Sequence, residues 1–265
     1  AGVGRLSSDS QFGSNFCSAR MGEQKSWLII KAMMNFFIAS VHRYVGWRLL
    51  TSADCTFPRD TIVQKQRGTT MWDVKFSVDE YVYGETPNDF LSEMTGRLKT
   101  GKALSLAEGE GRNAVHLARH GFTVTAVDSS IVGLNKAEKL AEKHGVGIET
   151  VHADLADYTI VENSWDSIVS IFCHLPPPLR EKIHGKVVSG LRKGGTFLLE
   201  AYTPEQLEHG TGGPQSIELL MKLETLAKEL EGLELVHAKE LTRDVREGSG
   251  HKGKAAVVQV LAKKI

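Results

Sequence analysis

Two glycines and two acidic residues share one short turn, in the segment LSLAEGEGRNAVHLA at residues 104–118. The order GEGRNA fits the pattern G-x-G-x-x-G/A, in which glycines let a turn between a strand and a helix approach a nucleotide closely. Asp128 follows about twenty residues later, at the spacing of an acid that binds ribose hydroxyls. The pattern predicts a nucleotide-type cofactor at this turn, but it does not by itself choose one.

The two acids, Glu108 and Glu110, separate the candidate cofactors. A nicotinamide dinucleotide would bring about two phosphate charges against the turn, and like charges a few ångströms apart cost on the order of 1–4 kcal/mol. S-adenosylmethionine has no phosphate and carries a sulfonium and an ammonium group. The turn therefore favours the methyl donor.

Short apolar runs alternate with amphipathic stretches from Lys102 onward. This alternation predicts a doubly wound, Rossmann-like α/β fold with a mostly parallel sheet. TPND (86–89) predicts the start of the preceding helix, with Thr86 as its cap. The helix after Pro176–Pro178 is expected to end at Lys193–Gly195. The predicted strands are KALSLA, FTVTAVD, GIETVHAD, WDSIVSIFCH and TFLLEAY.

The end of the chain breaks the alternation. After a helix expected over Ile217–Leu230 come two long β-like runs, LELVHAKELTRDVRE and KAAVVQVLAKK. The short, turn-prone GSGHKG between them predicts an antiparallel β-hairpin. An ordinary dinucleotide-binding fold has no reason to finish in this way.

The composition is that of an ordinary globular protein, with 41% apolar and 24% charged residues in 265. Lys+Arg and Asp+Glu are both 32, so no net charge attracts nucleic acid or anionic membrane. Three widely spaced cysteines (Cys17, Cys55, Cys173) form no CxxC pair, which favours a reducing compartment and a cytoplasmic location.

Residues 1–70 are interpreted as an N-terminal extension and 71–265 as the folded domain. The first twenty residues are rich in serine and poor in acids, which leaves organelle import open beside a disordered tail. WLIIKAMMNFFIAS (27–40) is too short to span a bilayer and contains Lys31.

The region from about Met71 to Lys264 resembles a class I S-adenosylmethionine-dependent methyltransferase. More narrowly, it resembles the branch that includes the tellurite-resistance and thiopurine-type small-molecule enzymes. LSLAEGEGRN corresponds to the glycine motif, TAVDSS to the ribose motif, HADLAD to the adenine motif and WDSIVSIFCHLP to the strand facing the reacting methyl. Two features depart from the family: Ser105 stands where an Asp is common, and Ala107-Glu108 replaces Gly-Cys.

The resemblance implies a class I methyltransferase fold with S-adenosyl-L-methionine as cofactor and no metal. Asp128 would bind ribose, Asp154 and Leu155 the adenine, and Phe172 would pack on the donor or in the core. Asn113 would either cap a helix or contact the donor. The expected cofactor-binding residues are Ala107, Glu108, Gly109, Glu110, Gly111, Asn113, Asp128, Ser129, Asp154, Leu155 and Phe172.

The candidate catalytic residues are His174 and Tyr83. His174 could deprotonate an acceptor or simply bond to a loop, and Cys173 beside it is not expected to act as a nucleophile. Tyr83, with Trp72 and Tyr81, could shelter a sulfonium by cation–π contact or clasp the domain edge. The loop 202–214 suits a lid or the rim of an acceptor pocket.

The resemblance implies methyl transfer to a small-molecule acceptor, a thiol, metalloid anion or similar soft nucleophile, and we expect a monomer or weak homodimer. One alternative is an NAD(P)-dependent oxidoreductase, which only GEGRNA and Asp128 support. The other is a non-catalytic protein that binds S-adenosylmethionine. The sequence has no basic stripe that would support methylation of protein or nucleic acid.

Overall fold

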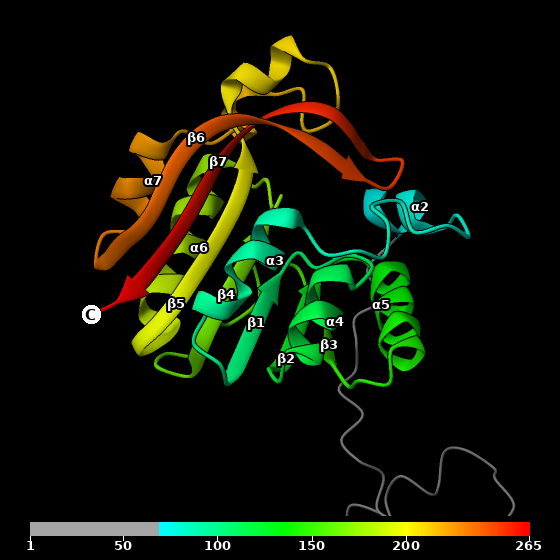
Figure 1. Ribbon diagram of the computed structural model, residues 1–265, viewed down its shortest axis with the longest axis horizontal. Helices are drawn as coiled ribbons and strands as arrows, with labels where there is room; N and C mark the ends of the chain where they lie inside the picture. Colours follow the sequence, from blue (N-terminus) through cyan, green and yellow to red (C-terminus); the bar gives the residue numbers. More distant parts are fainter. Residues whose placement is uncertain (1–68) are drawn as a thin grey trace, which may run out of the picture. The chain divides into compact units, whose positions relative to one another are not determined.

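The computed structural model describes residues 69–265. Residues 1–68 of the predicted extension, with Cys17, Cys55 and the apolar segment 27–40, lie outside this range. Within it, seven strands form one sheet in the order β3-β2-β1-β4-β5-β7-β6 (Figure 1). The strands are β1 (Lys102–Leu106), β2 (Thr123–Asp128), β3 (Glu149–His152), β4 (Trp165–Ile171), β5 (Leu191–Tyr202), β6 (Leu233–Glu247) and β7 (His251–Lys264).

Helices cover both faces of this sheet (Figure 1). The α-helices are α2 (Met71–Phe76), α3 (Asp89–Met94), α4 (Arg112–Arg119), α5 (Ile131–Lys143), α6 (Pro177–Gly190) and α7 (Leu223–Glu229). Short 3-10 turns are η1 (Thr95–Arg97), η2 (Pro204–Glu208) and η3 (Ile217–Leu219).

The alternation of side chains along each strand divides the core between the two faces. Leu104 and Leu106 of β1 pack with Ile183 of α6 on one face. Ala103, the residue before Leu104, packs on the other face with Phe90 of α3 and Leu117 of α4. Because successive strand residues point to opposite faces, a continuous apolar strand is what a sheet buried on both sides requires.

Strands β1 to β5 pair in parallel, and the chain then reverses direction. β7 inserts antiparallel between β5 and β6, with Leu199 of β5 opposite Val260. β6 and β7 form the predicted hairpin around the turn 248–250, and its last pair is Glu247 with His251. This is the predicted mostly parallel sheet with a closing antiparallel hairpin.

Three local predictions were wrong in detail. Asn88, not Thr86, caps the helix after TPND, because its buried side chain accepts from Leu91 N at 3.0 Å. The helix expected over 217–230 is interrupted between η3 and α7, where Met221 N donates to Tyr202 O at 2.9 Å. α6 ends at Gly190 because Leu191 already pairs with Trp165, and a bulge in β5 takes up the residues up to Gly195.

Candidate functional site

The predicted glycine turn connects β1 to α4 at the carboxyl end of the central strands. Gly109 has φ +67° and Gly111 has φ +94°, a backbone region in which side chains are strained. A Cβ at Gly111 would lie 2.5 Å from Ala137 Cα in α5, so this glycine is required for helix packing as well as for the turn. A Cβ at Gly109 would lie 3.2 Å from Cζ of Phe76 in α2.

Two residues with side chains hold left-handed backbone at this edge of the sheet. Ala107 follows β1 with φ +50°, and Phe172 follows the neighbouring β4 with φ +51°. Each such residue costs on the order of 1–3 kcal/mol, and such strain concentrates at functional sites. A glycine at position 107 would adopt this backbone conformation without that strain.

Glu108 turns inward and caps the helix that follows the turn. Its Oε1 accepts from Asn113 N at 3.0 Å and from Ala114 N at 2.9 Å, and Ser105 donates to Oε2. Burial raises the pKa of this carboxyl, while its hydrogen bonds act to lower it. These helix N–H groups are the ones that hold a pyrophosphate in dinucleotide-binding folds. Here a protein carboxylate already occupies them.

Glu110 is also engaged, although on the outer side of the turn. Lys136 of α5 lies 2.8 Å from its Oε1, and Tyr83 N donates to its Oε2 at 3.4 Å. The negative charge of this acid is therefore largely neutralised by Lys136. The two acids were expected to disfavour a phosphate through like charge. In the structure Glu110 is paired with Lys136, and Glu108 accepts from helix N–H groups that a phosphate would otherwise use.

Asp128 ends β2 next to the turn and ties the site together. Its Oδ2 accepts from Gly109 N at 2.8 Å, and its Oδ1 accepts from Ser130 N at 2.7 Å. Burial raises the pKa of Asp128, against the two backbone hydrogen bonds. A carboxylate has about four acceptor positions, so two lone pairs remain for ribose hydroxyls. The carbonyl of the adjacent Ser129 lies 3.0 Å from His152 Nε2.

The remaining predicted cofactor residues lie at the neighbouring strand ends. Asp154 follows β3 and accepts from Ala156 N at 2.9 Å. Leu155 is buried in the core beneath it. Asn113 neither caps α4 nor remains free, because its Oδ1 accepts from Asn88 N at 3.0 Å and so links α4 to the start of α3.

Aromatic rings gather where β4 and β5 end and β7 begins, and we call Tyr83, Phe172, Tyr202 and His251 the ring cluster. The centroid of Phe172 lies 4.6 Å from that of Tyr202 and 4.7 Å from that of His251. Tyr83 lies 4.5 Å from His251, which joins the segment before α3 to the closing hairpin. Burial of Tyr202 raises the pKa of its hydroxyl, so this ring carries no charge at neutral pH.

His174 stacks beside this cluster, but both of its nitrogens meet backbone groups. Nδ1 lies 2.9 Å from Leu219 O, and Tyr202 N donates to Nε2 at 3.4 Å. Burial lowers the pKa of His174 to about 4, so the ring is neutral. Burial raises the pKa of Cys173 to about 12, which keeps its thiol protonated and unreactive.

Sequence reasoning missed a buried polar network under the ring cluster. Glu200 of β5 and Glu247 of β6 are both almost fully buried. The Asn88 amide donates to the two carboxylates at 3.0 and 2.9 Å. Arg112 Nη2 lies 2.6 Å from Glu247, and Arg243 contacts both acids. Glu200 within the apolar run TFLLEAY was the available signal, because a lone acid there needs buried partners.

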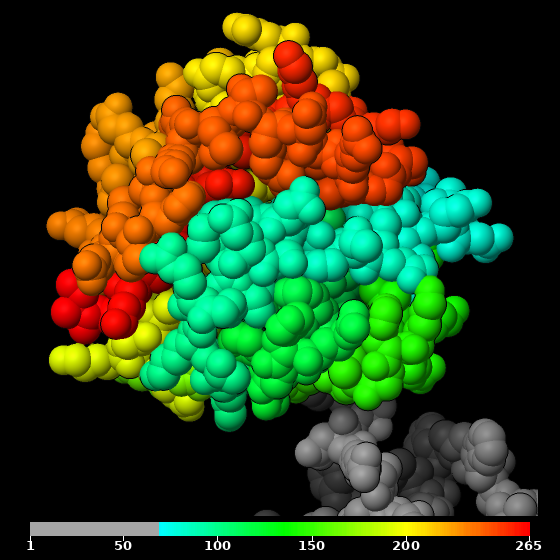
Figure 2. All heavy atoms as spheres, viewed as in Figure 1, coloured from blue at the N-terminus to red at the C-terminus, as the bar shows by residue number. Residues whose placement is uncertain are grey.

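Helix α2 covers the turn from outside. Asp73 accepts from Ser130 Oγ at 2.6 Å, and Phe76 rests on Gly109. Trp72, expected ahead of the first helix, lies within α2 and stacks on Phe76 at 5.6 Å. In Figure 2 this segment lies beside the terminal hairpin.

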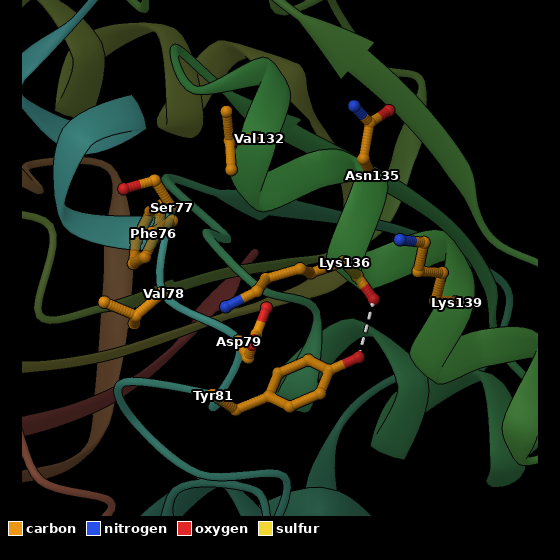
Figure 3. A pocket seen from close by; sticks show the side chains of 9 residues that line it. All are labelled: Phe76, Ser77, Val78, Asp79, Tyr81, Val132, Asn135, Lys136 and Lys139. Atoms are coloured by element: carbon orange, nitrogen blue, oxygen red, sulfur yellow. Dashed lines mark hydrogen bonds between the residues drawn. The ribbon is translucent and has the colours of Figure 1, made fainter.

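An open cleft of about 390 Å³ lies between the segment after α2 and helix α5 (Figure 3). Tyr81 borders it and donates to Lys136 O at 3.0 Å. None of the predicted cofactor or catalytic residues lines this cleft. The predicted residues lie instead at the carboxyl ends of the strands, where open α/β sheets bind ligands.

Comparison with known proteins indicates the kind of domain. A family model described as "Methyltransferase domain" matches residues 103–195, which contain the glycine turn, Asp128 and β4. A protein named "Uncharacterized methyltransferase YbaJ", from Bacillus subtilis (strain 168), is 27% identical over 186 residues, 65% of this chain and 69% of its own length.

Two solved structures share the fold. TehB from Haemophilus influenzae has a TM-score of 0.55 and 20% identity, over 67% of this chain and 62% of its own. An S-adenosylmethionine-dependent methyltransferase from Clostridium acetobutylicum ATCC 824 has a TM-score of 0.52 and 17% identity, over 72% and 94%. Residues 103–195 therefore match a methyltransferase domain, and the described residues have the class I methyltransferase fold.

The Clostridium acetobutylicum structure is described as S-adenosylmethionine-dependent, and the glycine turn of this chain has room for such a cofactor. Gly109 and Gly111 leave the space that a side chain would fill, and Asp128 faces them. With Glu108 on the α4 N–H groups, the nicotinamide alternative loses its phosphate site. Among residues 69–265, no helix is long and apolar enough to cross a membrane, and no cluster of ligating side chains could hold a metal.

Proposed function

We propose that this methyltransferase acts on a small, soft nucleophile, such as a thiol or a metalloid anion, by in-line displacement. The observation that carries the proposal is the closed wall around the ring cluster. Gly250 N donates to Val82 O at 2.9 Å, and a Cβ at Gly250 would lie 2.4 Å from the Tyr83 ring. Because the hairpin turn packs directly on the segment before α3, the acceptor side admits a small molecule more readily than a macromolecule.

The polarity of this wall favours a soft acceptor. Its surfaces are the faces and edges of aromatic rings, and its one ionisable heterocycle, His251, is buried. Such a lining stabilises polarisable sulfur or metalloid atoms by dispersion and does not solvate a hard, strongly hydrated nucleophile. No net charge draws a nucleic acid to the chain.

We assign the following roles to the chain's residues. The backbone at Ala107–Gly111 admits the cofactor's methionine part, Asp128 and Ser129 its ribose, and Asp154 and Leu155 its adenine. Glu108 and Asn113 hold the turn in shape from within, and Glu110 fixes Lys136 and the Tyr83 backbone.

Phe172 and Tyr83 form the wall near the reacting methyl, where ring faces can stabilise a sulfonium by cation–π contact. S-adenosylmethionine supplies an activated methyl group when bound. The protein's contribution is alignment of the two reactants and exclusion of water. His174, with both nitrogens on backbone groups, serves in this proposal to hold the end of β5 rather than to take a proton.

We further propose that the catalytic domain spans 71–265, that residues 1–70 are dispensable for methyl transfer, and that the enzyme works in a reducing, cytoplasmic setting as a monomer or weak homodimer. The test is a screen with radiolabelled S-adenosylmethionine against thiols, metalloid anions, halides, a protein mixture and RNA. Full-length protein and a truncation starting at Met71 are compared. Label in protein or RNA, with none in the small acceptors, would refute the small-acceptor assignment.

A further inference from the structure

His251 and Glu247 form a side-chain pair that the roles above leave unused. They are the last cross-strand pair of the terminal hairpin, on either side of the turn 248–250. His251 Nδ1 lies 3.5 Å from Glu247 Oε2, a long contact of the kind that tightens when a ligand binds. Both side chains are buried.

Glu247 is held firmly enough to orient the imidazole. Its Oε2 accepts from Arg112 and its Oε1 from the Asn88 amide. Burial acts to raise the pKa of Glu247. Hydrogen bonds from His251 and Arg112, together with the nearby positive charge, outweigh it and lower this pKa to about 2. The ionised carboxylate therefore favours the tautomer of His251 that carries its proton on Nδ1.

The other nitrogen, Nε2, is then the basic one. It has no hydrogen-bond partner among residues 69–265, and it points away from Glu247 because the two nitrogens lie on different sides of the ring. A Cβ at Gly212 would lie 3.1 Å from Cδ2, the carbon next to Nε2, so the glycine-rich loop 210–213 borders this edge of the ring. His174 differs, since backbone groups occupy both of its nitrogens.

Charged and titratable groups from every neighbouring element act on His251. Glu247 of β6 attracts a proton, whereas Arg112 of α4 and Lys75 of α2 repel one. Tyr83, Tyr202 and His174 complete its surroundings. Burial has the largest effect and lowers the pKa of His251, so the ring is neutral and able to accept a proton at neutral pH.

We propose that His251 is the catalytic base that removes the proton of a thiol acceptor, and that Glu247 is its positioning residue. This inference rests on the function proposed above and narrows the acceptor to a protic sulfur nucleophile. The S–H proton passes to Nε2 and the acceptor sulfur forms a bond to the methyl carbon. The bond from that carbon to the sulfonium breaks, and its electron pair stays on the departing thioether. The imidazolium then releases the proton to water.

The choice of a thiol follows from matching acidities. A thiol has a pKa of about 8.5 and is mostly protonated at pH 7, so a neutral imidazole beside it increases the reactive fraction. A halide has no proton to lose, and a metalloid oxyanion reacts through a lone pair that carries no proton, so neither would gain from this base.

The test uses two thiols that differ in whether they need a base. At pH 7.5 an alkyl thiol is mostly protonated, and an acidic aromatic thiol is already ionised. We expect His251→Gln to lower kcat/KM for the alkyl thiol by about 100-fold or more. The aromatic thiol should change only a few-fold, and calorimetry should give an unchanged Kd for S-adenosylmethionine. His144→Gln, an exposed histidine at the end of α5, is the matched control and should leave both rates unchanged.

Raising the pH supplies a second readout, because the deficit of His251→Gln with the alkyl thiol should shrink as that thiol ionises by itself. His251→Asn and thermal unfolding check that folding is intact. If neither variant folds, the wild type decides. Its kcat/KM per protonated alkyl thiol should be level above the pKa of His251 and should fall below that pKa as acid protonates the ring. A value that follows the thiolate fraction over the whole pH range overturns the inference.

Equal losses with both thiols, or none, would also overturn the inference. So would a wild-type enzyme that binds the cofactor and methylates metalloid anions but no thiol, although the proposed function would then stand. Failure of the wild type to label any small acceptor would instead refute the proposed function.

Discussion

Replacing Glu108 by alanine removes the carboxylate that occupies the first N–H groups of α4. Two buried donors, Asn113 N and Ala114 N, then lose their acceptor, together with the hydroxyl of Ser105. A buried donor left unsatisfied costs about 1–3 kcal/mol. We therefore expect Glu108→Ala to lower the free energy of unfolding by roughly 2–4 kcal/mol.

Glu108→Gln is the matched comparison. The amide oxygen can still accept from both helix N–H groups, and only the charge near the helix terminus is lost. That charge contributes on the order of 0.3–1 kcal/mol, so the glutamine variant should be much more stable than the alanine variant.

The assay is urea unfolding followed by circular dichroism, with and without sodium acetate at constant ionic strength. Acetate contains the atoms that the alanine variant lacks. A ligand that binds the folded state raises the stability by RT ln(1 + [L]/Kd), so acetate should stabilise Glu108→Ala selectively. Wild type and Glu108→Gln should not respond, because their donors are occupied.

Two results would refute this reasoning. One is an alanine variant as stable as the glutamine variant, which would mean that the hydrogen bonds to α4 contribute little. The other is a wild type stabilised by acetate or pyrophosphate as strongly as the alanine variant, which would mean that the helix terminus is open to anions after all.

Three further perturbations probe other parts of the site. Asp128→Asn should weaken S-adenosylmethionine binding by about 10- to 100-fold, since charge-assisted hydrogen bonds contribute about 1.5–3 kcal/mol each; an unchanged Kd in calorimetry would contradict the ribose assignment. Gly111→Ala should destabilise the fold by about 3 kcal/mol, through the strain of φ +94° and the 2.5 Å approach to Ala137 Cα. Gly145→Ala, with φ +67° and open space, should cost only about 1 kcal/mol in the same unfolding assay. The pKa of Glu247 lies at about 2 in the folded protein, below its unfolded value, so its stabilisation is present above pH ~4.3 and is lost as the pH falls towards 2. Glu247→Gln should therefore lose stability at neutral pH and converge with wild type in acid, and parallel curves would argue against the charged network.

Most of the fold could be predicted because its signals are local. The β-branched and apolar runs, the glycines that end helices and the turn-prone GSGHKG each lie within a few residues of the element they define. The errors arose where distant residues set the boundary. Asn88 starts α3 because Glu200 and Glu247 hold its amide, and Met221 leaves the expected helix because Tyr202 accepts its N–H.

The cofactor turn was predicted for a reason that the structure corrects in part. Gly109, Gly111 and Asp128 come together as the spacing indicated. The two acids beside them could not be oriented from spacing, because a side chain's rotamer depends on its neighbours in space. Lys136 of α5 forms an ion pair with Glu110, and the N–H groups at the start of α4 donate to Glu108.

By itself, the sequence determined the order of the strands and helices, the reversal at the end of the sheet and the acid that faces the glycine turn, because each depends on residues close together in the chain. Only the tertiary structure decided which side chains meet at the acceptor side. Tyr83, Phe172 and His251 are up to 168 residues apart, and the antiparallel insertion of β7 brings them within ring contact. Burial there also decides which imidazole nitrogens are free. A buried ring nitrogen cannot bond to bulk water, so it either bonds to the protein or stays available to a substrate.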